Sequence, residues 1–309
     1  MLVIVNPYAT SVDCKMRDLV LAALANRYAV EVVDTTAPGH ARELAAAASA
    51  DGTEVVATLG GDGTLNEAAD ALAGSRVALY PLPGGSQNVF AKLLGLPSEI
   101  VDSTARLLDL ADSWPLRRVD LGRVNSRVFT FSAGVGLDAS VVAKVDANPE
   151  RKARMRQWFY VQSGITVFLR SYALRKPRIA VETQTGELAA ATVLVQNGEN
   201  FTFAGAKPVT LCGNVGLDSG SFSAAVVNSG APLKAGVTAL RIVGATADSG
   251  GNNGTTQLGP LTSLRLRSSD GEPLPLQVDG DFAGLHQAVE FTIEPGALTV
   301  LAPALTRQA

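Results

Sequence analysis

The first 112 residues alternate short apolar runs with longer Ala/Leu-rich runs, and this alternation constrains the fold more than any other feature. The short runs are rich in β-branched residues, which favour strands, whereas the longer runs have the length and composition of helices. Strands that alternate with helices predict a parallel sheet covered by helices. The expected strands are residues 2–5, 29–33, 54–58 and 76–82, and the expected helices are 13–27, 39–50, 64–73, 87–95 and 98–111.

After residue 117 the pattern changes to alternating apolar and polar residues. A turn at Asn125 and Ser126 predicts a β-hairpin, and glycine turns separate further strands from residue 178 to about residue 301. The expected fold is an α/β domain at residues 1–122, followed by an antiparallel β-sandwich at 123–294. Residues 295–309 are a candidate segment to pack back on the first domain. A chain of 309 residues that is 47% hydrophobic is long enough for both cores.

Two segments of the second domain interrupt the expected strands. Residues 149–176 read as a helical insert that begins near Asn148. Residues 151–178 contain eight Lys or Arg, several aromatics and no acid, so this segment suits either an anionic membrane surface or a solvated helix on the sandwich. Periodicity does not decide between these two readings. Residues 247–256 are rich in glycine and indicate a hairpin loop, with a substrate lid as the alternative.

Composition excludes several classes of protein. The net charge of -3 argues against a general nucleic-acid binder, because phosphate contacts call for a basic excess. Cys14 and Cys212 have no CxxC spacing, and His40 and His286 lie in no metal or nucleophile pattern. The first residues do not resemble a signal peptide, and no apolar run approaches the roughly 18 residues of a membrane span. The expected compartment is the cytoplasm.

A glycine-rich turn in the stretch TLGGDGTLNEA (58–68) follows the third expected strand. Gly60, Gly61 and Gly63 permit close backbone approaches, and Thr64 is expected to cap the next helix, whose N-terminus favours anions. Asp62 nevertheless places a negative charge at the centre of the turn. The pattern is neither GxGxxG nor GxxxxGK[ST], and a purely structural turn stays open.

A second glycine loop makes an anion site more specific. The stretch PLPGGSQNVFAKLLGLP (81–97) again leads from a strand into a helix and offers Gly84, Gly85, Ser86 and Asn88. Ligands of parallel sheets bind at the carboxyl ends of the strands, where both loops are expected to lie. Together the two loops predict a nucleotide cradle.

These stretches occur in an order that resembles the diacylglycerol kinase catalytic domain family, which also includes sphingosine and ceramide kinases and bacterial lipid kinases. The resemblance covers nearly the whole chain, whereas GGDGT alone is also similar to NAD kinases and phosphofructokinases. The matching stretches are VNPYAT (5–10), GGDGTLNEAADAL (60–72), PGGSQNVFAKLLGLP (83–97), RRVDLGRVNSRVF (117–129), AGVGLDASVV (133–142), LDSGSF (217–222) and VDGD (278–281).

The resemblance implies ATP-dependent phosphorylation of a lipid hydroxyl, with the nucleotide between the two domains. Asp62 and Asp120 would serve a catalytic Mg²⁺, directly or through water, because a cation offsets the repulsion between carboxylate and phosphate. Asp279 and Asp281 match the family's Asp-Gly-Glu pair, whose second carboxylate is the candidate general base. The implied nucleotide-binding residues are Asn6, Gly60, Gly61, Asp62, Gly63, Thr64, Glu67, Gly84, Gly85, Ser86 and Asn88, with Glu67 helping to shape the first helix.

The chain departs from the family at four positions. Val89 and Lys92 replace an Asp and an Arg that bacterial members usually carry, and Asp281 is one methylene shorter than the usual Glu. Ser219 stands where some members have an Asp of a structural metal site, with Asp218 one place earlier. Because bacterial members of this length and domain plan most often have that activity, the resemblance implies diacylglycerol as the acceptor, with a sphingoid base or another long-chain alcohol as alternatives. A lipid- or nucleotide-binding protein without turnover and a soluble kinase of the NAD-kinase type are the rival hypotheses, and the oligomeric state is open.

Overall fold

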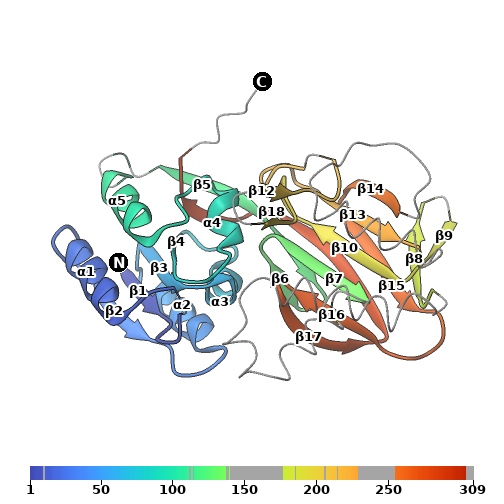
Figure 1. Cartoon of the computed structure of the whole chain (residues 1–309), viewed down its shortest axis with the longest axis horizontal. Coiled ribbons are helices and arrows are strands. Elements are labelled where there is room, and N and C mark those ends of the chain that lie inside the picture. The colour runs from blue at the N-terminus through green and yellow to red at the C-terminus, as the bar shows by residue number, and fades with distance from the viewer. Residues whose placement is uncertain are drawn as a thin grey trace. The chain divides into compact units, whose positions relative to one another are not determined.

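The structure is a computed structural model, and the chain divides into two compact units (Figure 1). Unit 1 comprises Met1–Leu121 with Pro295–Ala309, and unit 2 comprises Gly122–Glu294. The expected helical insert and most of the 247–256 loop lie outside the described residues. These are residues 1–9, 11–110, 113, 115–136, 139, 177–184, 186–204, 207–213, 215–228 and 255–303.

Unit 1 is built on a parallel sheet, as the alternating pattern predicts. Its strands are β1 (Leu2–Val5), β2 (Glu31–Asp34), β3 (Val55–Gly60), β4 (Ala78–Pro83) and the last residues of β18 (Ala288–Leu301). They lie in the order β2-β1-β3-β4-β18, and all of these pairings are parallel. Every residue of β1, β3 and β4 is buried, which is why these strands read as continuous apolar runs rather than alternating ones.

Five helices accompany this sheet. They are α1 (Cys14–Ala25), α2 (His40–Ala50), α3 (Asp62–Leu72), α4 (Val89–Leu93) and α5 (Ile100–Leu110). In unit 1, α2 packs against α3 and α1 against α5 (Figure 1). The helix expected at 87–95 is shorter, because Asn88 at φ 49° and Gly95 at φ 73° are left-handed and limit it at both ends. Asp13 caps α1 by accepting the Met16 N–H at 2.8 Å.

Unit 2 contains two larger antiparallel sheets and a two-stranded antiparallel sheet formed by β11 and β12. The first has the order β14-β13-β10-β7-β16-β17, and in the second β15 pairs with β18 and β8, and β8 with β9. The first sheet comprises β7 (Ser132–Gly136), β10 (Thr192–Gln196), β13 (Phe222–Val227), β14 (Thr255–Leu261), β16 (Leu274–Val278) and β17 (Asp281–His286). The others are β5 (Leu116–Val124), β6 (Arg127–Phe129), β8 (Ile179–Thr183), β9 (Gly186–Ala190), β11 (Thr202–Ala204), β12 (Lys207–Val209) and β15 (Ser263–Ser268).

One hydrophobic core joins residues of both sheets in unit 2, as in a sandwich. At its centre the rings of Phe129 and Phe291 meet edge to face, with centroids 6.1 Å apart. Gly122 lies opposite Phe129 in the β5–β6 pair, and a Cβ on Gly122 would collide with the ring of Phe129. The predicted hairpin turn at Asn125 joins these strands. The structure therefore confirms the predicted fold class, a parallel α/β domain followed by an antiparallel β-sandwich.

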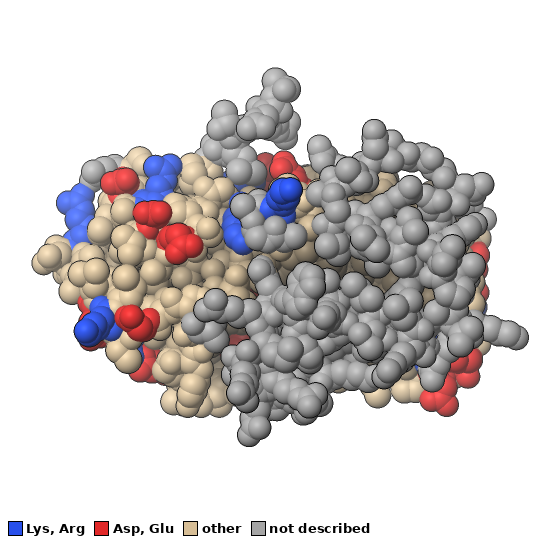
Figure 2. All heavy atoms as spheres, in the orientation of Figure 1, with Lys and Arg blue, Asp and Glu red and all other residues tan. Residues whose placement is uncertain are grey.

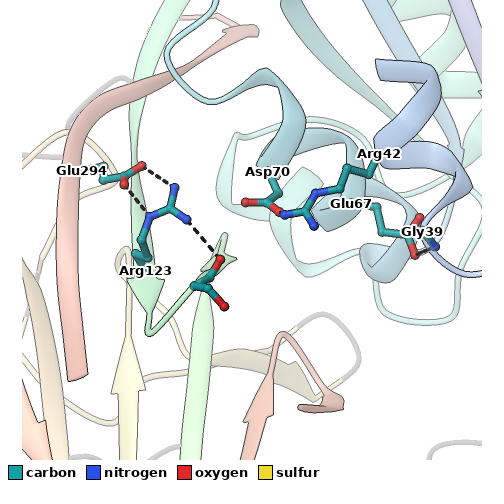
Figure 3. A network of polar contacts seen from close by, with 7 residues as sticks. Gly39, Arg42, Glu67, Asp70, Arg123 and Glu294 are labelled. Atoms are coloured by element: carbon teal, nitrogen blue, oxygen red, sulfur yellow. Dashed lines mark hydrogen bonds and ion pairs between the residues drawn. The ribbon is translucent and has the colours of Figure 1, made fainter. Parts of the chain in front are cut away.

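The chain crosses from unit 1 to unit 2 within β5 and returns within β18. Just inside unit 2 the guanidinium of Arg123 binds Glu294 through two hydrogen bonds, of 2.5 and 3.2 Å, and donates to the Ser126 carbonyl at 3.3 Å (Figure 3). The two crossing strands are thus held to each other within unit 2. No helix in the described part of the chain is both long and apolar enough to span a membrane.

Candidate active site

The two glycine loops touch each other at the carboxyl ends of β3 and β4. The strands are in register up to Gly60 and Pro83, and the Gly84 N–H donates to the Gly60 carbonyl at 2.8 Å. A Cβ on Gly85 would lie 2.7 Å from the Cα of Gly61, and one on Gly84 would lie 3.2 Å from the Cα of Gly60. Only glycine permits this approach, so the structure brings these four glycines together, as expected from a shared sheet edge.

Asn6 joins the end of β1 to the first loop. Its backbone N–H donates to the Leu59 carbonyl at 2.9 Å, and its Nδ2 donates to the Thr64 hydroxyl at 3.0 Å. The expected capping role of Thr64 is wrong, because α3 begins two residues earlier, at Asp62, with Gly61 as its N-cap. Thr64 lies inside the first turn and fixes Asn6 instead.

The first turn of α3 contains backbone N–H groups that have no carbonyl partner within the helix. The first i to i−4 bond of the helix joins the Leu65 N–H to the Gly61 carbonyl at 3.2 Å, so the N–H groups of Gly63 and Thr64 precede the helical ladder. Gly63 is therefore a helix residue rather than a turn residue. Such an N-terminus favours anions, as the sequence predicts.

The carboxylate of Asp62 reaches from the first loop to the second. Its Oδ2 accepts the Val89 N–H at 3.1 Å, and its Oδ1 accepts the Phe90 N–H at 3.2 Å, so Asp62 binds the N-terminus of α4. Lys92 lies near this charge. Burial lowers the pKa of Lys92 below its ordinary value, and the Asp62 carboxylate partly offsets that effect. Two backbone donors and a cation thus already stabilise the charge of Asp62.

Asn88 closes the second loop on itself. Its Oδ1 accepts the Gly85 N–H at 3.0 Å, and its Nδ2 donates to the Gly85 carbonyl at 2.8 Å. Ser11 supports the loop from outside, since its N–H donates to the Gly84 carbonyl and its hydroxyl to the Gly85 carbonyl. Ser86 is exposed at the tip. A narrow cleft beside the loops is lined by Gly60, Gly61, Asp62 and Asn88, together with Thr58, Leu65, Pro81, Pro83 and Ala91.

Glu67 does not line this cleft and instead binds the start of α2 (Figure 3). Its two carboxylate oxygens accept the N–H groups of Gly39 at 2.8 Å and Ala41 at 3.2 Å. One turn further along α3, Asp70 pairs with Arg42 of α2. Glu67 therefore fixes α2 against α3.

Asp120 is 2% exposed and is not among the residues that line the cleft. Its Oδ1 accepts the N–H of Gly296 at 2.7 Å, while the Nε of Arg118 donates to the carbonyl of the same glycine, also at 2.7 Å. Gly296 is left-handed at φ 56°. Asp120 thereby anchors the returning strand β18 within unit 1.

The described residues contain no group of three His, Cys, Asp or Glu side chains that could hold a metal ion by itself. This applies to Asp218 as well, beside which the Ser219 hydroxyl donates to the Ser221 carbonyl at 3.1 Å. Mg²⁺ commonly binds through one or two carboxylates, substrate phosphates and water. Single carboxylates such as Asp62 fit that mode of binding.

Asp279 and Asp281 lie in unit 2, at the hairpin turn between β16 and β17. Asp279 at φ 47° and Gly280 at φ 89° form the two-residue turn, and Val278 pairs with Asp281. Consecutive left-handed residues, with glycine second, are typical of a type I′ hairpin. Asp281 is partly exposed, whereas Asp279 is only 7% exposed.

The Asp279 carboxylate accepts four hydrogen bonds. Its Oδ2 accepts the Thr130 N–H at 2.7 Å and the Thr130 hydroxyl at 2.8 Å, and its Oδ1 accepts the N–H groups of Phe131 at 3.1 Å and Ser132 at 2.9 Å. Burial raises the pKa of Asp279, and these four hydrogen bonds oppose the rise. The resemblance to the family's Asp-Gly-Glu pair marked Asp279, but the sequence carried no signal for its partner Thr130.

On the face drawn in Figure 2, the charged side chains of unit 1 form small groups of both signs on a mostly uncharged surface. That described surface is thus of mixed charge, in keeping with the small net charge of the chain.

Comparison with known proteins identifies the class to which this fold and these loops belong. Residues 1–124 match the model of the diacylglycerol kinase catalytic domain. Over 273 residues the chain is 30% identical to a protein of Pseudomonas aeruginosa named "Probable lipid kinase YegS-like", covering 86% of this chain and 82% of that protein. It is 29% identical over 281 residues to a "Diacylglycerol kinase" of Mycobacterium tuberculosis, covering 89% and 84%.

The fold has a counterpart among solved structures as well. The crystal structure of a diacylglycerol kinase from Bacillus anthracis matches with a TM-score of 0.73 at 21% identity, over 98% of this chain and 96% of that chain. The chain belongs to the diacylglycerol kinase-like family of lipid kinases.

Proposed function

We propose that the protein transfers the γ-phosphate of Mg²⁺-bound ATP to the hydroxyl of a lipid, with diacylglycerol as the leading acceptor. The observation that carries this proposal is the contact between the two glycine loops, in which a Cβ on Gly85 would lie 2.7 Å from Gly61. The contact places the second loop beside the α3 N-terminus, where the N–H groups of Gly63 and Thr64 precede the helical ladder. Phosphoryl transfer depends mainly on such positioning and on charge neutralisation.

The nucleotide half of the reaction is assigned to unit 1. Ser86 and the N–H groups of Gly63 and Thr64 would bind phosphate oxygens, and Asn6 would orient the first loop through Thr64. Mg²⁺, when bound, would neutralise the charge that develops on the phosphates. Asp62 would hold it through water, because its carboxylate lies at the first turn of α3 and the residue lines the cleft beside the two loops. Asp120 stays a second, more distant candidate.

The acceptor half is assigned to unit 2, with Asp281 accepting the proton of the attacking hydroxyl. Diacylglycerol leads because the relative from M. tuberculosis is named a diacylglycerol kinase. A sphingoid base or another long-chain alcohol is the alternative acceptor.

A binding protein without turnover is the rival reading, motivated by Val89, Ser219 and Asp281. Val89 weakens that reading. Its N–H still donates to Asp62, and its side chain is 2% exposed in the core of unit 1. The change from the family's Asp therefore leaves the contact between the loops intact.

An assay with a lipid panel tests the proposal. Radiolabelled ATP with Mg²⁺ and lipids in mixed micelles should give a labelled product that extracts into organic solvent. Asp281→Ala should lower the rate of product formation roughly 100-fold or more, whereas Asp270→Asn, at an exposed aspartate of the same unit, should leave it unchanged. Nucleotide binding without labelled lipid for any acceptor would favour the binding protein, and label on NAD would favour a kinase of the NAD-kinase type.

The basic segment 151–178 is proposed to contact an anionic membrane surface and to bring the kinase to its lipid. Replacing its first four cations with serine should abolish binding to anionic liposomes. Unchanged binding would leave a solvated helix as the better reading. These cations are Arg151, Lys152, Arg154 and Arg156.

A further inference from the structure

The buried carboxylate of Asp279 ties the β16–β17 turn to a segment of unit 2 that is distant in sequence. Besides its four side-chain bonds, the Asp279 N–H donates to the Ser132 carbonyl at 2.8 Å, so five hydrogen bonds join this residue to residues 130–132. Thr130 is 0% exposed and Ser132 is 3% exposed. Hydrogen bonds in such a dry site are strong, and losing one partner is costly.

Segment 130–132 is held from its other side as well. The N–H of Asn197 donates to the Phe131 carbonyl at 2.8 Å, and the Nδ2 of Asn197 donates to the Thr130 carbonyl at 2.9 Å. Asn197 is itself 0% exposed. The N–H groups of the segment thus bind the Asp279 carboxylate, while the carbonyls of Thr130 and Phe131 bind Asn197. These bonds leave the segment little freedom to move.

The chemistry of these partners requires a carboxylate. All four groups that face the Asp279 side chain are donors, and an ionised carboxylate is the side chain that only accepts. An asparagine would direct its NH₂ group at two of those donors. The same side chain, engaged by four donors at 7% exposure, is poorly placed to receive a proton from a substrate.

Asp281 follows two residues later, at the other end of the Asp-Gly turn, where it pairs with Val278. A general base must lie within hydrogen-bond reach of the hydroxyl that it deprotonates, and a misplacement of about 1 Å can cost roughly 100-fold in rate. We propose that Asp279 is a positioning residue that acts through Asp281. The five hydrogen bonds between Asp279 and residues 130–132, including the one from the Thr130 hydroxyl, form a clamp that holds the turn. This proposal rests on the proposed function, because it requires Asp281 to be the proton acceptor.

A double-mutant cycle separates positioning from independent effects. Asp281→Ala should lower kcat roughly 100-fold or more, and Asp279→Asn about tenfold or more, with the dissociation constant for ATP unchanged in both. The double variant should be no slower than Asp281→Ala, because a clamp without its base has nothing to position. Losses that multiply in the double variant would overturn the clamp. Full activity of Asp281→Ala would overturn both the clamp and the assigned base.

Threonine variants control for stability. Thr130→Val removes the hydroxyl that binds Asp279, and Thr192→Val removes another buried hydroxyl of unit 2, which donates to the Val135 carbonyl at 2.9 Å. The two should lower Tm comparably, but only Thr130→Val should lower kcat, and Thr130→Ser should restore it. Equal losses of kcat in both valine variants would refute the proposal.

Amide hydrogen exchange can test the hydrogen bonds of the clamp even if the protein phosphorylates none of the lipids. In amide hydrogen exchange, the N–H groups of Thr130, Phe131 and Ser132 should be protected in the wild type and lose protection selectively in Asp279→Asn. Unchanged protection would overturn the clamp. Absence of activity in the wild type with every lipid would count against the proposed function alone.

Discussion

Replacing Gly85 with alanine should separate the two glycine loops. The added Cβ would lie 2.7 Å from the Cα of Gly61 and 3.1 Å from the Oδ1 of Asn88, and real Cβ contacts are essentially never closer than 3.0 Å. Because Gly61 offers backbone rather than a movable side chain, the loops themselves must move until this separation reaches about 3.4 Å. Overpacking of this kind costs about 1–3 kcal/mol. We expect Tm to fall by roughly 3–10 °C in a unit of this size.

Nucleotide binding should weaken together with stability, since the same displacement opens the proposed phosphate site. If the displacement of the loops weakens the binding free energy of ATP by about 1.4 kcal/mol, the dissociation constant for ATP rises roughly tenfold. Thermal unfolding and calorimetric titration with Mg·ATP measure the two effects. Gly213→Ala is the matched control, because a Cβ there meets nothing within 4 Å. A Gly85→Ala protein with the Tm and ATP affinity of the control would refute the inference that the loops touch.

Three further outcomes follow from particular contacts. Gly122→Ala should lower the free energy of unfolding, measured with denaturant, by about 2–3 kcal/mol, because the added Cβ collides with the Phe129 ring. The double variant with Phe129→Leu should regain part of that free energy. Asp62→Ala should lower the free energy of unfolding by about 1–3 kcal/mol, even in EDTA without nucleotide, because two backbone N–H groups of α4 lose their acceptor. An unchanged free energy of unfolding would show that the contact with α4 is dispensable. Burial raises the pKa of Cys212 from 9.0 to about 11. A thiol reagent at pH 8 should therefore label only the exposed Cys14 in the folded protein. The free energy of unfolding should fall between pH 9 and 11, because the Cys212 thiol ionises in the unfolded chain before it does in the folded one.

The sheet edge was predictable because it follows from local pattern and general geometry. β-branched runs ending in glycine marked β3 and β4, and parallel neighbours end at the same edge, so the approach of Gly60 to Gly84 needed no further information. Helix boundaries were less certain. Because α3 begins two residues before the expected helix, Thr64 lies inside the helix and is a partner of Asn6 instead of the expected cap.

Side-chain directions were not predictable where the partner is remote in sequence. Asp279 binds Thr130 across 149 residues, and Asp120 binds Gly296 across 176, so neither contact leaves a periodic or spacing signal. Even the shorter reach from Asp62 to Val89, 27 residues away, depends on how α4 is placed by its own loop. These contacts depend on tertiary structure, which pattern and propensity do not encode.

Four of the five carboxylates predicted for the site accept backbone N–H groups of a distant segment: Asp62 at α4, Glu67 at α2, Asp120 at Gly296 and Asp279 at residues 130–132. A carboxylate that replaces water as acceptor for buried N–H groups supports the architecture whether or not it also meets a ligand. An alanine variant that loses activity at any of these four positions would therefore not by itself identify a catalytic or metal-binding group. Asp281, partly exposed at the end of its turn, is the proposed proton acceptor, so its replacement tests the proposed chemistry if the hydrogen bonds of Asp279 stay intact.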